Sequence, residues 1–320
     1  GSAVAIQPST GKILAMASNP GYNPNDLMGD SAEETWANLQ EQEGQPLVNH
    51  AGAETLPPGS IFKIITTAAG LNNGFDPSST LTGSNVITLP DTVTELTNYA
   101  NQKCNGQDAV TLQTAFALSC NTAFVEMSEQ LGADELRKYA KAFGVGENYD
   151  LGVSTSAGTL GDLPDGAATA QSAIGQRDVT MTALQAAVMA GTVANKGTRM
   201  QPYLVNRITD AQMKDVRTTK PKKADQAVNE ETAATLTDLM YASERSSWGY
   251  DGNGFASKTG TAEHGEGLAP HVWYVAFDPE RDIAVGVVVK NGGNLGESAT
   301  GGKVSGPIGR AILRAYQGEQ

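Results

Sequence analysis

Ser60 and Lys63 are residue types that can act together as a nucleophile and its base. They lie three positions apart, so a helix would place them on one face. A serine hydroxyl attacks a carbonyl carbon poorly unless a neighbouring base takes its proton. A lysine amine can be that base when burial or a second cation lowers its pKa. The apolar neighbours favour such burial, although a capping serine followed by an exposed lysine is the more common origin of this pattern.

A second pair of polar residues, Ser119 and Asn121, flanks Cys120. The Ser119 hydroxyl could relay a proton, and the Asn121 amide could hold both Lys63 and an amide group of a substrate. The alternative is a short polar turn between two helical stretches, with no chemical role. Taken alone, the pair does not decide between these two interpretations.

The third group is Lys258 with the residues that follow it, Thr259, Gly260 and Thr261. Threonine favours strands, so we expect this group on a strand. Such a strand could pair with an extended peptide, while the lysine and the threonine hydroxyls hold a carboxylate and Gly260 leaves the approach open. The alternative is an edge-strand lysine that binds no ligand.

The composition excludes several other kinds of site. The 320 residues include 22 Lys and Arg against 35 Asp and Glu, and this net charge of −13 argues against a nucleic-acid surface or a polybasic membrane surface. The sequence contains neither of the glycine-rich phosphate motifs, no H-E-x-x-H motif and only three histidines. We therefore expect no metal, no cofactor and no nucleic-acid partner.

The spacing of apolar residues predicts the elements that position these groups. Two short apolar runs around a glycine-containing turn predict a hairpin at residues 3–7 and 13–17. Prolines before a periodic run predict a helix over residues 60–71, whose N-terminus would favour a developing oxyanion beside Ser60. Further helices are expected at residues 33–42, 112–131, 133–143, 181–194 and 308–316. Further strands are expected at residues 255–259, 272–277 and 283–289.

The order of these elements predicts the fold class. Strands at both chain ends, with helices between them, indicate an α+β domain with one antiparallel sheet assembled from the two ends. Helices would flank this sheet and form a mostly helical subdomain. Residues 75–110 are expected to be irregular with short strands. Residues 291–302 contain five glycines and are interpreted as a mobile loop near the site that gates access to it.

In this order the three polar groups match S-x-x-K, S-x-N and K-T-G, the signature of penicillin-recognising serine acyltransferases. The chain resembles the transpeptidase domain of class B penicillin-binding proteins, and most of all the actinobacterial penicillin-binding protein A group. Other stretches that carry the resemblance are residues 5–16, 22–25, 57–60, 173–176, 261–264 and 300–302. The resemblance covers essentially the whole chain and implies the fold shared by penicillin-binding transpeptidases and serine β-lactamases.

This resemblance implies a D,D-transpeptidase that cross-links peptidoglycan. Ser60 would be acylated by the penultimate D-alanine of a stem peptide, releasing the terminal D-alanine, and the acyl group would pass to an amine on a neighbouring strand. Lys63 would be the base, Ser119 would shuttle the proton, and Asn121 would orient Lys63 and the substrate backbone. β-Lactams mimic the D-Ala-D-Ala end of the peptide, so they would acylate and inhibit the enzyme.

The resemblance also assigns the late strand to the substrate carboxylate. Lys258 would add positive potential, while Thr259 and Thr261, on either side of Gly260, would bind the carboxylate. The backbone N–H groups of Ser60 and Thr261 would form the oxyanion hole, where losing one donor typically costs about 3–4 kcal/mol of transition-state stabilisation.

Members of this family work on the extracytoplasmic face of the bacterial membrane, held by an N-terminal anchor helix and a non-catalytic pedestal domain. We expect residues 1–320 to be the transpeptidase domain alone, without either of these parts. Cell-division or elongation proteins would be reached through those N-terminal regions. In such an oxidising compartment Cys104 and Cys120 could form a disulfide, or they could be two unrelated small residues.

Two other functions share the three motifs. A serine β-lactamase hydrolyses its acyl-enzyme with the help of a glutamate, but the one similar string, residues 95–98, precedes Ser119 and Asn121 instead of following them. A β-lactam sensor domain is acylated and acts as a receptor. The opening hairpin and residues 175–176 favour the cross-linking enzyme over both alternatives.

Overall fold

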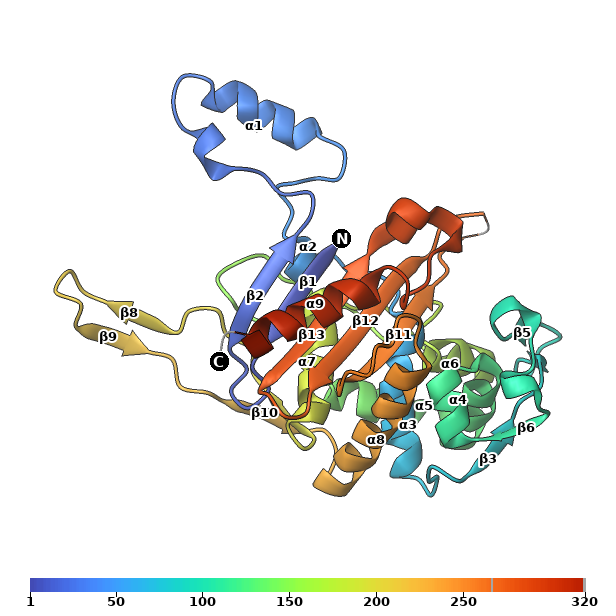
Figure 1. Ribbon diagram of the computed structural model, residues 1–320. Coiled ribbons are helices and arrows are strands. Elements are labelled where there is room, and N and C mark those ends of the chain that lie inside the picture. The colour runs from blue at the N-terminus through green and yellow to red at the C-terminus, as the bar shows by residue number, and fades with distance from the viewer. Residues whose placement is uncertain (266, 319–320) are drawn as a thin grey trace.

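A five-stranded antiparallel sheet forms the centre of the computed structural model, which describes residues 1–265 and 267–318 (Figure 1). Its strands are β1 Ser2–Ile6, β2 Ile13–Ser18, β11 Ala256–Ala262, β12 His271–Asp278 and β13 Ile283–Val289. They lie in the order β11-β12-β13-β1-β2. The first strand pairs with β13, with Ile6 opposite Ala284. The prediction of one antiparallel sheet built from both chain ends is confirmed.

Helices cover both faces of this sheet. Figure 1 shows α9, Ser305–Gly318, crossing one face and α7, Ala183–Ala194, lying against the other. Because both faces are covered, β12 is buried along its whole length and its sequence is an apolar run instead of an alternating pattern. In β13, a Cβ at Gly286 would lie 2.5 Å from the carbonyl oxygen of Ala183, so this glycine lets α7 approach the sheet closely.

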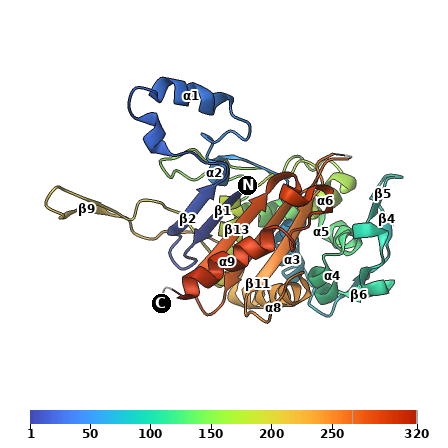
Figure 2. The same ribbon diagram turned by 45° about the horizontal axis from the view of Figure 1, so that its top comes forward.

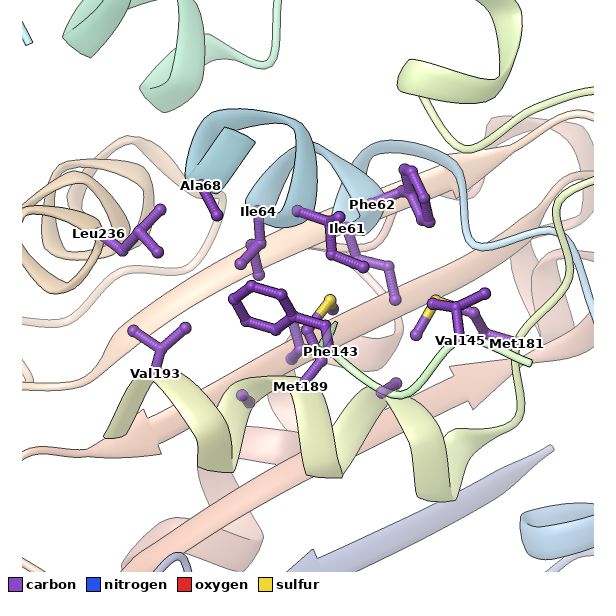
Figure 3. Close-up of a cluster of buried hydrophobic side chains, with 14 of the residues drawn as sticks. Ile61, Phe62, Ile64, Ala68, Phe143, Val145, Met181, Met189, Val193 and Leu236 are labelled. Carbon is purple, nitrogen blue, oxygen red and sulfur yellow. The ribbon is translucent and has the colours of Figure 1, made fainter. Parts of the chain in front are cut away.

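The core continues from the sheet into the helical part of the molecule. Its central helix, α3 (Lys63–Leu71), is buried over its first eight residues and packs against α5 and α8, which span Asn121–Ala142 and Glu230–Ser246. Figure 3 shows Ile61 and Ile64 pointing toward the same apolar cluster as Phe143. This packing places the turn before α3 against β11 of the sheet.

The remaining elements surround this core. The other α-helices are α1 Ala32–Glu41, α2 His50–Ala53, α4 Leu112–Leu118 and α6 Gly166–Ala173. Short 3-10 helices are η1 Pro24–Leu27, η2 Gly59–Phe62, η3 Tyr99–Asn101, η4 Cys104–Gly106 and η5 Lys290–Ser298. Two-stranded pairs are formed by β3 Thr80–Thr82 with β6 Ala109–Thr111, β4 Val86–Thr88 with β5 Glu95–Thr97, β7 Thr198–Met200 with β10 Lys223–Gln226, and β8 Arg207–Thr209 with β9 Asp215–Thr218.

Several predicted elements differ from those observed. The helix expected from Ser60 begins as the 3-10 turn η2, and α3 starts only at Lys63. The helix expected at residues 112–131 is interrupted at Ser119, whose φ of 61° ends α4. Within α5 the backbone departs from helical geometry at Gly132, where φ is 74° and ψ is 172°. The sequence predicted one helix ending at residue 131 and another beginning at residue 133, so the break lies where it was expected.

Three α-helices and two strand pairs were not predicted from the sequence. They are α2, α6, which is short and rich in alanine, α8, the β7–β10 pair and the β8–β9 hairpin. Both α1 and the β8–β9 hairpin project away from the sheet (Figures 1 and 2). Across the described residues, none of the helices has the length and apolar character that crossing a membrane requires.

Candidate active site

The turn that carries Ser60 is held in place by contacts with distant segments. The Trp273 indole Nε1 donates a hydrogen bond to the Pro57 carbonyl oxygen at 2.8 Å. The Gly59 amide donates to the Gly175 carbonyl oxygen at 2.9 Å. A Cβ at Gly175, where φ is +73°, would lie 2.1 Å from the Gly59 carbonyl oxygen, so only glycine fits there. The backbone on the N-terminal side of Ser60 is therefore hydrogen-bonded both to β12 and to the segment that follows α6.

Strand β11 lies directly beside this turn. A Cβ at Gly260 would be 2.7 Å from the Pro58 carbonyl oxygen, and one at Gly301 would be 2.7 Å from the Gly260 carbonyl oxygen. The Gly301 amide also donates to the Thr261 hydroxyl at 3.4 Å. The glycine of the K-T-G group thus lets the Ser60 turn and the 300–302 loop pack against opposite sides of the strand. The end of the predicted 291–302 loop does lie at the site, and its gating role stays a prediction.

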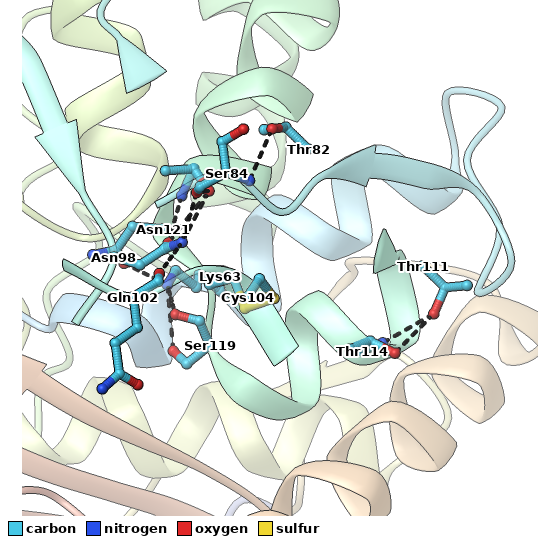
Figure 4. Close-up of a disulfide and its surroundings, with 12 residues drawn as sticks. Lys63, Thr82, Ser84, Asn98, Gln102, Cys104, Thr111, Thr114, Ser119 and Asn121 are labelled. Atoms are coloured by element: carbon cyan, nitrogen blue, oxygen red, sulfur yellow. Dashed lines mark hydrogen bonds between the residues drawn. A yellow bond between two sulfur atoms is a disulfide. The ribbon is translucent and has the colours of Figure 1, made fainter. Parts of the chain in front are cut away.

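Lys63 is fully buried and its amine is bound by the S-x-N group. Its Nζ donates to the Asn121 Oδ1 at 2.7 Å, to the Ser119 carbonyl oxygen at 2.8 Å and to the Ser119 Oγ at 3.3 Å (Figure 4). The same nitrogen lies 5.2 Å from the centre of the Phe124 ring. The structure therefore brings together Lys63, Ser119 and Asn121, which sequence analysis had proposed for one site.

The surroundings of Lys63 favour its uncharged form. Burial, and then the positive charge of Lys258, lower the pKa of Lys63 well below its ordinary value of 10.5. Lys258 is fully buried as well, and this burial lowers the pKa of its amine to about 7. Its Nζ donates to the Thr259 carbonyl oxygen at 3.1 Å. An amine whose pKa is lowered in this way can accept the proton of a serine hydroxyl.

Ser60 stands one turn before Lys63 and is partly exposed. Among the described residues, no hydrogen bond joins the Ser60 hydroxyl to Lys63, because the lysine amine is directed to Ser119 and Asn121. Catalytic hydrogen bonds of this kind are often long in a free enzyme and shorten in the substrate complex. On the other side of the turn, a Cβ at Gly59 would lie 3.0 Å from the Thr261 carbonyl oxygen, which places β11 beside the nucleophile.

The S-x-N turn has an unusual backbone and a covalent tether. Ser119 adopts left-handed dihedral angles, with φ 61° and ψ 40°, and ends α4. Cys120 is the N-cap residue of α5 and forms a disulfide with Cys104. The Asn121 Nδ2 donates to the Thr97 carbonyl oxygen at 3.1 Å. The turn is thereby attached to the β4–β5 pair, which also adjoins the site.

Trp273 and Thr97 also belong to this site and were not predicted from the sequence. A partial signal for Trp273 was available, since this aromatic residue lies on the strand expected at residues 272–277. Its position opposite Gly260 is known only from the structure. No comparable signal marks Thr97, because its contribution is a backbone carbonyl whose position depends on the tertiary fold.

Comparisons with known proteins agree with this geometry. The family described as penicillin binding protein transpeptidase domain matches residues 1–314. The peptidoglycan D,D-transpeptidase PbpA of Mycolicibacterium smegmatis is 45% identical over 329 residues, which cover 98% of this chain and 66% of that protein. PbpA of Mycobacterium tuberculosis is 42% identical and is covered to 67%. The chain thus spans about two thirds of the length of these relatives.

Solved structures give the same result. A penicillin-binding protein A from M. tuberculosis, a ceftriaxone acyl-enzyme complex, matches 98% of this chain and 73% of its own at 42% identity, with a TM-score of 0.95. The D,D-transpeptidase domain of a peptidoglycan glycosyltransferase from Eggerthella lenta matches the whole chain and 79% of its own at 26% identity, with a TM-score of 0.85. With the family match over residues 1–314, these similarities show that the chain belongs to the penicillin-binding protein transpeptidase domain family.

Proposed function

We propose that this chain is a serine D,D-transpeptidase that cross-links peptidoglycan stem peptides and is acylated by β-lactams. The observation that carries the proposal is the buried amine of Lys63, held by Ser119 and Asn121 beside Lys258, one turn after Ser60. The names of the similar proteins, peptidoglycan D,D-transpeptidase and penicillin-binding protein A acyl-enzyme complex, support it.

Acylation begins with proton transfer. The neutral Lys63 amine takes the proton of the Ser60 hydroxyl as its Oγ attacks the carbonyl carbon of the penultimate D-alanine. The backbone N–H groups of Ser60 and Thr261 donate to the oxyanion that forms. Ser119, whose Oγ lies 3.3 Å from the Lys63 amine, then passes the proton to the leaving nitrogen. The C–N bond breaks, the terminal D-alanine leaves, and an ester remains on Ser60.

Transfer reverses these proton movements. The amine of an acceptor stem peptide attacks the ester carbonyl carbon, its proton passes to the Lys63 amine, and the Ser60 oxygen leaves with a proton returned by that lysine. The product is a new amide bond. A β-lactam enters the same first step, but its leaving nitrogen stays attached to the acyl group, so the ester persists.

The K-T-G strand and the Asn121 amide bind the substrate. The hydroxyls of Thr259 and Thr261 would donate hydrogen bonds to the terminal carboxylate. Gly260 keeps β11 free of a side chain where the Ser60 turn approaches it. Lys258 supplies positive potential. Because the pKa of its amine is about 7, a substrate carboxylate nearby would shift the amine toward its charged form. Asn121 would orient the peptide backbone as well as Lys63.

We further propose that residues 1–320 form one transpeptidase domain that acts on the extracytoplasmic face of the bacterial membrane. The similar proteins named peptidoglycan D,D-transpeptidase support this location, because their substrate lies outside the membrane. Proteins of cell division or elongation would then bring the enzyme to its site of action. Neither a metal nor a cofactor takes part in the proposed steps.

The proposal is tested by labelling with a fluorescent penicillin. Ser60→Ala should abolish labelling and leave the melting temperature nearly unchanged, because the serine side chain is not buried in the core. Ser156→Ala, a half-buried serine in a loop, is the matched control and should label normally. Undiminished labelling of Ser60→Ala would remove this residue from the mechanism.

A second assay separates the transpeptidase from its alternatives. A thioester analogue of the stem peptide should give an amide product only when a D-amino acid is supplied as acceptor. Rapid turnover of a chromogenic cephalosporin would instead identify a β-lactamase. Stable labelling with no amide product under any acceptor would identify a sensor domain.

A further inference from the structure

Asn98, outside the three motifs, ties the β4–β5 segment to the first turn of α5. Its side chain is buried, and its Nδ2 donates to the carbonyl oxygens of Ser84 and Gln102 at 2.9 and 3.2 Å. Its Oδ1 accepts the Thr122 amide at 3.0 Å, and the Thr122 hydroxyl donates to the Ser84 carbonyl oxygen at 2.8 Å. Figure 4 shows this network beside Asn121. The residue directly after the S-x-N group is thus fixed by Asn98.

The neighbouring residue Thr97 sets the orientation of the Asn121 amide. Its carbonyl oxygen is an acceptor only, so it binds the Nδ2 end of the amide, at 3.1 Å. The Oδ1 end then faces the Lys63 amine at 2.7 Å. Rotating the amide by half a turn would place two oxygens together at Thr97 and two donors together at Lys63. The backbone of the β4–β5 segment therefore determines which end of Asn121 meets the base.

The disulfide holds the same turn from the other side. Cys120 stands between Ser119 and Asn121 and is bonded to Cys104 in η4. The backbone amide of Cys104 donates to the Gly83 carbonyl oxygen at 2.8 Å. Ser119 has a left-handed backbone that a residue with a Cβ adopts only when its surroundings enforce it. Its carbonyl oxygen and hydroxyl both accept hydrogen bonds from Lys63, so the position of the base depends on this backbone.

We propose that Asn98 and the Cys104–Cys120 disulfide are two latches that hold the S-x-N turn in the geometry that Lys63 needs for acylation. Neither touches the substrate or the reacting atoms, so both act as positioning groups. The inference rests on the proposed acylation of Ser60. It adds that the rate of this step is set partly by residues 84–104, which lie outside the three motifs.

The first test compares Asn98→Ala with Asn85→Ala. Asn85 lies in the same segment, and its Nδ2 donates a hydrogen bond to the Asn101 Oδ1 at 3.0 Å, so it is a matched control. Stopped-flow kinetics with a fluorescent penicillin separate the pre-covalent dissociation constant from the acylation rate constant. We expect Asn98→Ala to slow acylation by about ten- to a hundredfold, as small displacements of catalytic groups do, with an unchanged dissociation constant. Asn85→Ala should match the wild type.

The pH profile of acylation distinguishes positioning from a general loss of stability. The carbonyl acceptors around Lys63 favour its charged form, so weakening them in Asn98→Ala lowers the pKa of the base. The acid limb of the rate profile should then move to lower pH. Lys258, the charged group that faces Lys63 from β11, is unchanged in both variants. A variant that is only less stable would keep the wild-type profile in its folded fraction.

The second test opens the disulfide. Treating the folded wild type with a dithiol exchanges the Cys104–Cys120 bond for two thiols and leaves the reagent as a cyclic disulfide, which a free-thiol count verifies. Reduction should also slow acylation without changing the dissociation constant. Because both latches hold one turn, reducing Asn98→Ala should cost more than the product of the two separate effects.

Three results would overturn the proposal. They are an acylation rate of Asn98→Ala equal to that of Asn85→Ala, an unchanged rate after reduction of the wild type, and effects that multiply independently. The reduced wild type supplies the test if Asn98→Ala does not fold. A wild type that fails to be acylated at all would refute the proposed function instead, so the two failures are distinguishable.

Discussion

Gly175→Ala should disable the enzyme from a position outside its three motifs. The added Cβ would lie 2.1 Å from the Gly59 carbonyl oxygen and 2.8 Å from the Phe62 Cβ, and the backbone φ is +73°. Left-handed backbone costs a residue with a Cβ about 1–2 kcal/mol. Forcing an extra methyl group into a close contact adds about 1–3 kcal/mol. The free energy of unfolding should therefore fall by about 2–5 kcal/mol.

The chain offers a matched control for the backbone part of this cost. Gly152 has a nearly identical φ of +74°, but a Cβ there would meet nothing within 4 Å. Gly152→Ala should thus lose only the backbone contribution, about 1–2 kcal/mol. The difference between the two variants measures the contact with Gly59. In a chain of this size each kcal/mol lowers the melting temperature by about 2 °C, so the two variants should be resolved by calorimetry.

Activity gives the sharper contrast. Relief of the contact moves the Gly59 carbonyl and with it Ser60, and a displacement of about 1 Å can cost a hundredfold in rate. Stopped-flow acylation by penicillin should show this loss in Gly175→Ala and a wild-type rate in Gly152→Ala. Equal acylation rates in the two variants would show that the Gly175 contact does not position the nucleophile.

Two further variants test the charges. Lys258→Met removes the cation that helps lower the pKa of Lys63, so this pKa should rise. The acid limb of the pH profile of acylation should then move to higher pH. An unmoved limb would contradict the electrostatic effect of Lys258 on Lys63. Glu244→Gln leaves Arg310 buried without its 2.7 Å ion pair and should destabilise the fold by about 3–5 kcal/mol in denaturant titrations. Burial raises the pKa of Glu244, but hydrogen bonds led by the one from Arg310 outweigh burial and hold the pKa below 4.5. The stability that ionised Glu244 contributes is therefore present above pH 4.5 and is lost as the pH falls through the pKa of the folded state. A Gln variant with unchanged acid sensitivity would refute this account.

The chemistry-bearing residues could be predicted from sequence because their signal is local. The spacing of Ser60 to Lys63 and of Ser119 to Asn121 needs no knowledge of the fold. The strands of the sheet could also be predicted, since the strands of a sheet covered on both faces are apolar runs such as β12. A local signal also existed for α8, where Asn229 caps the helix and two glutamates follow, yet it was missed.

The contacts that hold the site could not be predicted in this way. Trp273 and Pro57 are 216 positions apart, and Gly59 and Gly175 are brought together by the packing of distant segments. The roles of Thr97 and Asn98 depend on how the β4–β5 segment docks against α5. Such positions are fixed by the balance of packing over the whole domain and leave no periodic pattern in the chain.

The most direct measurement of the central claim is the intact mass of the protein after incubation with penicillin, followed over time and combined with peptide mapping. Our account predicts the addition of one penicillin on the peptide that contains Ser60, and an adduct that persists after the free drug is removed. An unmodified mass, or an adduct carried by another residue, would contradict it.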